Sequence, residues 1–270
     1  MKLFISVDME GISAITDDQD VKVGGKDYEY GRKLLTQDVN AAIEGALEAG
    51  VTHIVVNDSH DSMRNVIVEE LNPRAELIRG FLKPLVMMEG IDETFDAVFL
   101  IGHHGRAGTM DGVLNHTLSY SIQRFLLNGK EVGEAGLNAT IAAACGVPVV
   151  LVTGDSQVAQ EVERELPGVH TVAVKTGIGM HTARCLHPSV TKQMIKDAAK
   201  KAIEDCRNIA PLDVEDSYVL EVEFKSTKSA QIVSYMPEVE LVGTRTVRYQ
   251  TNDMRKAMPV ILAMLLLGSH

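Results

Sequence analysis

The sequence predicts an α/β protein with three layers, in which a mostly parallel sheet carries helices on both faces. In the first two-thirds of the chain, short and almost entirely apolar strand segments alternate with amphipathic helical segments. Strands that are apolar along their whole length are typical of parallel sheets covered on both faces. After Pro188 the pattern changes to alternating strands and helices, which predicts a smaller C-terminal α+β unit.

The first element is a strand over residues 2–7, followed by a helix over residues 28–49 whose apolar residues recur at helical spacing. Gly50 then stands where helices commonly end. A second helix is expected at 157–166. The other strands of the predicted sheet share an apolar, β-branched character: residues 53–56, 96–101, 149–152 and 171–174.

Two parts of the chain depart from this alternation. Asn128 and Gly129 form a hairpin turn signal between strand segments at 125–127 and 130–132. The C-terminal unit is expected to contain a helix at 190–206, strands at 219–224 and 239–249, and a terminal helix from residue 252. We therefore expect an α/β domain over residues 1–180 and a smaller α+β domain over 181–267. Residues 268–270 (Gly-Ser-His) resemble a tag remnant.

Composition excludes several classes of protein. Hydrophobic residues are 45% of the chain and charged residues 23%, which is typical of globular proteins and not of disordered ones. Acidic residues outnumber basic ones by 37 to 26, a balance that disfavours nucleic-acid binding. The longest apolar run, residues 258–267, is half of the roughly 20 residues that span a bilayer. Three cysteines without a Cys-x-x-Cys motif favour a reducing compartment, so we expect a cytoplasmic protein that binds neither membrane nor nucleic acid.

Common catalytic motifs are absent from the sequence. It contains no G-x-x-x-x-G-K-[ST] phosphate loop, no H-E-x-x-H zinc motif and no G-x-S-x-G nucleophile motif. These absences argue against the usual nucleotide-binding, zincin and serine-hydrolase functions.

Polar residues follow three of the predicted parallel strands directly. Asp8 and Glu10 follow the first strand, His60 follows the second, and the pair His103-His104 follows the strand at 96–101. A further acid, Glu134, begins the helical run that follows the hairpin. The carboxyl ends of parallel strands meet at one edge of the sheet, so these side chains are expected to lie close together.

Three carboxylates with two imidazoles exceed the three protein ligands of a typical single catalytic zinc. The set suits two metal ions about 3.5–4 Å apart, bridged by a carboxylate and activating a shared water. Mixed oxygen and nitrogen ligands favour zinc, with manganese or cobalt as alternatives. Adjacent loop residues rarely face the same ion, so only one of His103 and His104 is expected to be a ligand.

Three other polar residues near strand ends are expected to have structural roles. Asp58 is expected to cap a helix or begin a turn. Asp155 is expected to cap the helix that follows it, with the orienting of a metal-binding histidine as the alternative. Lys175 is expected to be an exposed lysine at a strand end, with a place in the lining of the crevice as the alternative.

Five ordered blocks of sequence closely resemble the zinc-dependent D-aminopeptidases, a family of self-compartmentalising metallopeptidases. The blocks are KLFISVDMEGIS (2–13), VNDSH (56–60), IGHHGRA (101–107), LNHTLS (114–119) and VGEAGLNA (132–139). The resemblance runs in order from residue 1 to about residue 190 and continues more weakly to the C-terminus.

This resemblance implies a two-zinc aminopeptidase that removes the N-terminal residue, such as D-Ala, from short peptides by attack of a metal-bound hydroxide. It implies that Asp8 bridges two zinc ions per subunit and that His116 is the catalytic histidine. The remaining ligands that it implies are Glu10, His60, His104 and Glu134. It also implies a ring-like homo-oligomer, a decamer in the type member.

Two other functions remain open at this stage. A two-metal phosphoesterase would use the same carboxylates and histidines, although no cluster of Arg or Lys lies beside them in the sequence and Arg106 is the nearest. A metal-stabilised binding protein without catalysis would hold metal tightly and would not require His116.

Overall fold

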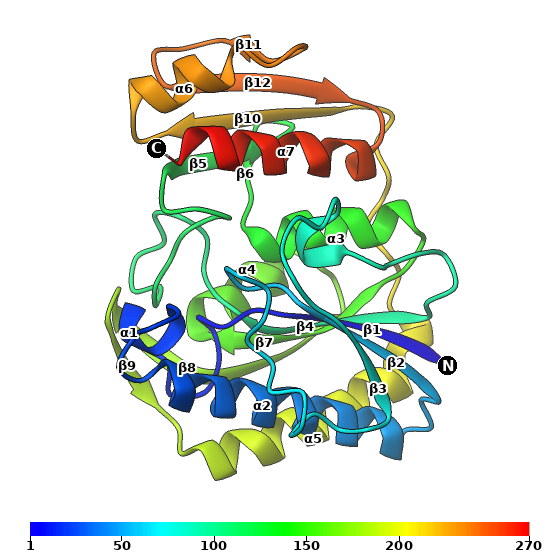
Figure 1. Cartoon of the computed structure of the whole chain (residues 1–270). Helices are drawn as coiled ribbons and strands as arrows, with labels where there is room; N and C mark the ends of the chain where they lie inside the picture. Colours follow the sequence, from blue (N-terminus) through cyan, green and yellow to red (C-terminus); the bar gives the residue numbers. More distant parts are fainter. Residues whose placement is uncertain (270) are drawn as a thin grey trace.

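The larger of two sheets is mostly parallel, as the sequence predicts, and has seven strands. The computed structural model describes residues 1–269 (Figure 1). In the order β3-β2-β1-β4-β7-β8-β9, all neighbouring strands are parallel except the pair β8 and β9. The strands are β1 (Lys2–Val7), β2 (His53–Asp58), β3 (Ala75–Ile78), β4 (Ala97–His103), β7 (Val149–Asp155), β8 (His170–Gly179) and β9 (Thr182–Cys185). The five strands expected for this sheet are confirmed, and β3 and β9 extend it at its two edges.

Helices cover both faces of this sheet, as predicted. The long helices α2 (Tyr28–Glu48) and α5 (Pro188–Asp205) pack against each other below it, and the short helix α1 (Asp18–Val21) lies against α2 (Figure 1). On the other face lie α3 (Glu134–Ala144) and α4 (Ser156–Glu165). Alternate residues of β1 enter the two cores, with Ile5 on the α2 side and Phe4 on the α3 side.

A second, antiparallel sheet lies beyond α3. Its order is β11-β12-β10-β5-β6, and α6 (Thr227–Val233) and α7 (Met254–Gly268) pack on it (Figure 1). The strands are β5 (Ile122–Leu127), β6 (Lys130–Glu131), β10 (Tyr218–Phe224), β11 (Glu240–Leu241) and β12 (Thr246–Thr251). Burial alternates along β10, so one face of this sheet is apolar and meets the helices.

The sheets do not divide at residue 181. The turn between β8 and β9 contains that boundary, β9 stays in the larger sheet, and α5 packs on α2. The predicted hairpin forms, with Asn128 and Gly129 at positive φ, but β5 pairs with β10 of the C-terminal sheet. One apolar cluster also joins the larger sheet, α3 and α7 to the second sheet. Gly268, expected in a tag remnant, ends α7, and His270 lies outside the described residues.

The ends of β1 and β4 approach each other closely. The Asp8 amide donates to the Ile101 carbonyl oxygen at 2.8 Å, and the Gly11 amide donates to the Gly102 carbonyl oxygen at 2.7 Å. A Cβ atom at position 11 would overlap with the His103 carbonyl oxygen, so only glycine fits. This contact brings the residues that follow β1 and β4 into one region.

Within residues 1–269, no helix combines the length and the apolar character needed to cross a bilayer.

Replacing Gly11 with Ala is expected to lower the free energy of unfolding by about 3 kcal/mol, because the strand ends must separate to admit the methyl group. Gly50→Ala is a suitable control, since Gly50 has φ +89° with no atom near its missing Cβ. There only the backbone conformation is unfavourable, at a cost of about 1–2 kcal/mol. Urea unfolding measures whether Gly11→Ala loses more unfolding free energy than Gly50→Ala does. A Gly11→Ala protein as stable as the unmodified one would contradict the packing argument.

Candidate metal centre

The five side chains expected as metal ligands lie together at the carboxyl ends of β1, β2 and β4, beside the first turn of α3. All of them are almost completely buried, with at most 8% of each residue exposed. They are Asp8, Glu10, His60, His104 and Glu134. Because β1 has β2 on one side and β4 on the other, this edge is where the direction of strand addition reverses, the usual binding crevice of such sheets.

Asp8 lies between two groups of these side chains. Its Oδ1 is 3.4 Å from His60 Nδ1, and its Oδ2 is 3.4 Å from His104 Nε2. The two oxygens of one carboxylate therefore face two different imidazoles. This is the arrangement that a bridging carboxylate needs.

Each group also contains a second carboxylate. Glu10 Oε2 is 2.9 Å from His60 Nδ1, and Glu134 Oε1 is 3.6 Å from His104 Nε2. In each group the three potential ligand atoms lie within 4.8 Å of one another. The two sets of three are therefore each compact enough for one ion.

Hydrogen bonds on the far side of each ring fix both imidazoles. His60 Nε2 bonds to the Val21 carbonyl oxygen at 3.0 Å, and His104 Nδ1 bonds to the Gly105 carbonyl oxygen at 3.0 Å. A carbonyl only accepts, so each of these nitrogens carries the proton. His60 Nδ1 and His104 Nε2 then hold the lone pairs that face the acids, an orientation typical of metal-binding histidines.

His103 turns away from this group. Its Nε2 lies 3.1 Å from Asn138 Nδ2 on α3, and it belongs to neither set of potential ligands. Burial lowers the pKa of His103 to about 4, so its ring is neutral. Of the adjacent pair, His104 is the one that faces the carboxylates.

Burying three carboxylates together perturbs the pKa of every group in the cluster. Burial, with the charges of Glu10 and Glu134, raises the pKa of Asp8 to about 7. Burial opposes charge on His60, but the Glu10 and Asp8 carboxylates outweigh it and hold the His60 pKa well above its ordinary value. A second proton on either imidazole can supply positive charge to these carboxylates, and a divalent metal ion would displace that proton and take over the role.

Unpaired atoms in the cluster support a metal ion directly. Within the described residues, Asp8 Oδ2, Glu10 Oε2 and His104 Nε2 are buried and have no hydrogen-bond partner when the imidazole nitrogens that face the acids hold lone pairs. Such atoms are rare and costly in folded proteins. All three point into the cluster, so their number and chemistry fit divalent cations with mixed oxygen and nitrogen ligands.

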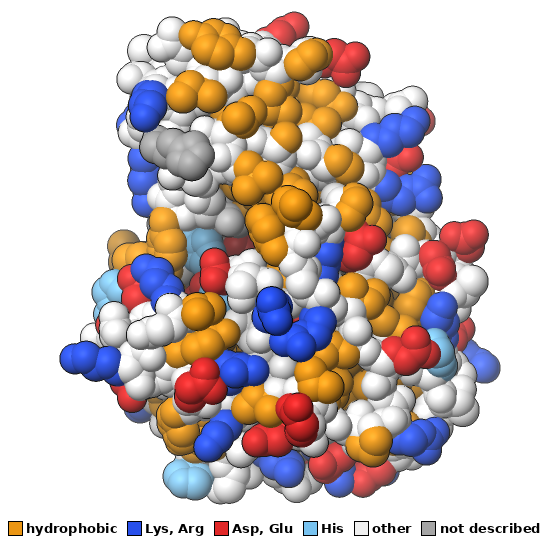
Figure 2. Space-filling model, in the orientation of Figure 1, with side chains coloured by type: hydrophobic (Ala, Val, Ile, Leu, Met, Phe, Trp, Pro, Cys, Tyr) orange, Lys and Arg blue, Asp and Glu red, His pale blue; other side chains and the backbone are white. Residues whose placement is uncertain are grey.

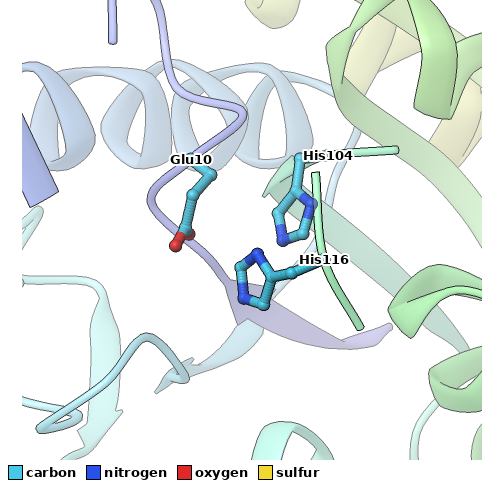
Figure 3. A group of neighbouring side chains, drawn as sticks. All are labelled: Glu10, His104 and His116. Atoms are coloured by element: carbon cyan, nitrogen blue, oxygen red, sulfur yellow. The ribbon is translucent and has the colours of Figure 1, made fainter. Parts of the chain in front are cut away.

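His116 lies at the edge of the cluster on the loop between β4 and β5. Its ring stacks on His104 at a centroid distance of 4.3 Å and on Tyr120 at 4.4 Å. Figure 3 shows the Glu10 carboxylate turned toward the same space as the rings of His104 and His116. His116 Nδ1 donates to the Leu114 carbonyl oxygen at 2.9 Å, which leaves Nε2 with its lone pair 3.6 Å from Glu134 Oε1.

A cleft of about 640 Å³ opens over these side chains. Asp8, Glu10, His116 and Glu134 form its polar floor. Apolar residues of the 3-10 turn η1 (Val86–Met88) and of α7 form much of the remaining lining: Val86, Met87, Leu262, Leu265 and Leu266. Figure 2 shows the hydrophobic surface that this part of the molecule presents.

Several residues that build the site have roles that the sequence pattern does not predict. Lys175, expected to be exposed, is only 1% exposed, and burial lowers its pKa to about 8. Asp155 caps α4 as expected, and its other oxygen also accepts from the Val113 amide at 2.9 Å, near His116. Tyr120 and the wall from α7 were not anticipated. No local pattern marks these residues, because long-range packing alone brings them to the site.

Asp58 has a structural role, but it neither caps a helix nor begins a turn, because its partners lie seven and eight residues later in the chain. Its Oδ2 accepts from the Val66 amide at 2.7 Å and its Oδ1 from Asn65 Nδ2 at 2.9 Å. The carboxylate therefore organises the loop after His60 instead of joining the cluster.

Known proteins match the chain over almost its whole length. The model of a D-aminopeptidase family, peptidase family M55, matches residues 1–263. The chain is 40% identical to a D-aminopeptidase of Bacillus subtilis (strain 168) over 265 residues, which is 98% of this chain and 96% of that protein. It also superposes with a TM-score of 0.97 on the Zn-dependent D-aminopeptidase DppA from Bacillus subtilis, described as a self-compartmentalizing protease. That match is 40% identical and covers 100% of this chain and 98% of that structure.

Replacing His104 with Ala is expected to lower the amount of divalent metal in the purified protein, because it removes one ligand from the group around Asp8 Oδ2. His103→Gln is the matched control, since it changes the adjacent buried histidine but not a side chain facing the acids. Plasma mass spectrometry of the two proteins measures their metal content. Loss of metal from His103→Gln with full metal in His104→Ala would reverse the assignment.

Proposed function

The chain belongs to the D-aminopeptidase family, and from this membership and the geometry of the cluster we propose a two-zinc aminopeptidase acting on short peptides. The residue removed is an N-terminal D-amino acid such as D-Ala. One observation carries the two-metal proposal: the oxygens of Asp8 face separate imidazoles, each accompanied by its own glutamate.

In this proposal Glu10 and His60 hold one zinc ion, His104 and Glu134 hold the other, and Asp8 bridges them. When bound, zinc polarises a carbonyl group and lowers the pKa of water to about 7, which is the chemistry that amide hydrolysis needs. The ligands are set in advance by the hydrogen bonds of His60 to Val21 and His104 to Gly105.

His116 moves the proton in this proposal. Burial and the neighbouring His104 lower the pKa of His116, so its ring is neutral near pH 7. Because Nδ1 donates to Leu114, only Nε2 can exchange a proton with the reactants. His116 therefore accepts a proton at Nε2 from the attacking water, and as an imidazolium it then hydrogen-bonds the developing oxyanion and donates that proton to the leaving amine.

The cleft suits a short peptide better than a phosphate ester. Among the described residues that line it, the only Lys or Arg is Lys22, whose Nζ is 2.9 Å from Asp18 Oδ2. Arg106, the nearest arginine in the sequence, pairs with Glu131 at 3.1 Å. The lining thus offers a phosphate group no free Lys or Arg among the described residues, which disfavours a phosphate ester as the substrate. The apolar wall from η1 and α7 instead offers contact for peptide side chains.

We extend the proposal to assembly and location. The Bacillus subtilis relative is described as self-compartmentalizing, and we propose that this chain likewise forms a homo-oligomer, with ten subunits. The exposed apolar residues Leu266 and Leu267 at the end of α7 are consistent with an interface there. The free thiols of its three cysteines favour a cytoplasmic location.

The function is tested by assaying purified protein of known zinc content on matched D-alanyl and L-alanyl dipeptides and on an aryl phosphate. We expect release of D-alanine to be fastest and to disappear when a chelator removes the zinc. Bound zinc with no turnover of any substrate would indicate a binding protein, and hydrolysis of the phosphate alone would indicate a phosphoesterase.

Replacing His116 with Ala is expected to lower kcat by about 100-fold or more while the zinc content stays unchanged. His53→Ala is the matched control, because His53 is an exposed histidine at the start of β2. Steady-state kinetics and metal analysis of both variants separate the possibilities. If zinc content falls along with kcat, His116 is a ligand, which its position near Glu10 and His104 allows geometrically.

A further inference from the structure

A buried lysine holds the loop that carries two of the proposed ligands. Lys175, on β8, extends under the loop that follows β1. Its Nζ donates to the carbonyl oxygens of Glu10 at 2.5 Å, Ile12 at 2.9 Å and Ile15 at 2.7 Å. An ammonium group has three N–H donors, so all of them are used on this one loop.

These three carbonyl groups have no strand partner, and of the three only that of Ile12 also accepts from a backbone amide, that of Ile15 at 3.2 Å. The loop leaves the sheet after Val7, and its course from residue 8 to residue 17 contains turns but no regular element. Buried backbone carbonyls need a donor, and here they converge on one point. Lys175 therefore occupies the position that a bound cation with carbonyl ligands would occupy.

A second buried side chain holds the same loop from the other side. Asp38, on α2, accepts hydrogen bonds from the Ser13 amide at 2.9 Å and the Ser13 hydroxyl at 2.8 Å. The loop is thus fixed by a cation at its carbonyls and by an anion at an amide and a hydroxyl group. Such fixed loops hold ligand side chains in place without help from the metal.

Lys175 does not reach the reacting groups itself. It is absent from the lining of the cleft, and its contact with the cluster is through the main chain of Glu10. The side chain of that same residue reaches His60 Nδ1 at 2.9 Å. Any influence of Lys175 on the site must therefore pass through the position of the loop.

We propose that Lys175 is a positioning residue of the metal centre, whose ammonium group fixes the loop after β1 so that Asp8 and Glu10 are arranged for metal before metal binds. The proposal rests on the proposed function in one respect, the assignment of those carboxylates as zinc ligands. Residues that support metal ligands in this way commonly change metal affinity by about 10–100-fold.

The direction in which zinc affinity changes when Lys175 is replaced separates a positioning role from an effect of its charge. Removing a positive charge near the three carboxylates would by itself strengthen the binding of a divalent cation, because it removes a repulsion. Losing the fixed loop would weaken binding, because the metal would then have to order the loop. A weaker affinity in an uncharged variant therefore indicates positioning.

The experiment compares zinc dissociation constants of the unmodified protein and Lys175→Met, by competition with a chromophoric chelator. Methionine keeps the length and apolar stem of lysine without its donors or charge. Val222→Ala is the control, because it removes buried volume from β10 in the second sheet. We expect Lys175→Met to bind zinc at least tenfold more weakly and Val222→Ala to bind as the unmodified protein does.

Thermal unfolding with and without zinc gives a second measurement. A positioning role predicts that zinc raises the Tm of Lys175→Met by less than it raises the Tm of the unmodified protein. A purely structural role lowers both Tm values equally and leaves the dissociation constant unchanged, which would overturn the proposal. Lys175→Gln, which keeps one polar donor group, replaces the Met variant if that variant does not fold.

The outcomes also separate this proposal from the proposed function. Zinc binding by the unmodified protein with equal or tighter binding by Lys175→Met would overturn the positioning role alone. An unmodified protein that binds no zinc would remove the two-zinc function, and the positioning role with it.

Discussion

The concentration of negative charge at one edge of the parallel sheet is the constraint on which the site depends. Asp8, Glu10 and Glu134 are each at most 4% exposed, and they share a space with only two histidines that compensate them directly. Burying an ion without compensation costs on the order of several kcal/mol. A site of this kind is stable only if protons or metal ions supply positive charge, and the unpaired ligand atoms point to metal.

The fold keeps these carboxylates together by backbone contacts that tolerate little change. Gly11 and Gly102 let the ends of β1 and β4 touch, and Lys175 ties the intervening loop to β8. Asp155, the neighbour of Lys175 on the adjacent strand β7, holds the loop that carries His116. The end of β8 thus supports the loop with the proposed ligands, and the end of β7 supports the loop with the proposed proton carrier.

Much of the larger sheet could be predicted from sequence, because strands buried on both faces are continuous apolar runs. The segments 2–7 and 96–101 are recognisable for this reason, and the polar residues after them are conspicuous. The segment around β3 is half-exposed and gives no such signal, and β9 follows β8 without an intervening helix. The pairing of β5 with β10 joins residues 93 to 102 positions apart, which local pattern does not reveal.

The sequence also predicts which residues meet at the candidate site, but not how each side chain is oriented there. Strand ends that converge indicate which acids and histidines meet, and the spacing does not distinguish His103 from His104. That choice depends on the direction of each ring, which Asn138 and Gly105 determine in the fold. Lys175 resembles an ordinary surface lysine in sequence for a similar reason: its three acceptors lie about 160 residues earlier in the chain.

Anomalous diffraction at the zinc edge from crystals grown with zinc tests the two-metal account most directly. The account requires two peaks on either side of the Asp8 carboxylate, one beside His60 and Glu10 and the other beside His104 and Glu134. A single peak, or peaks away from Asp8, would contradict it.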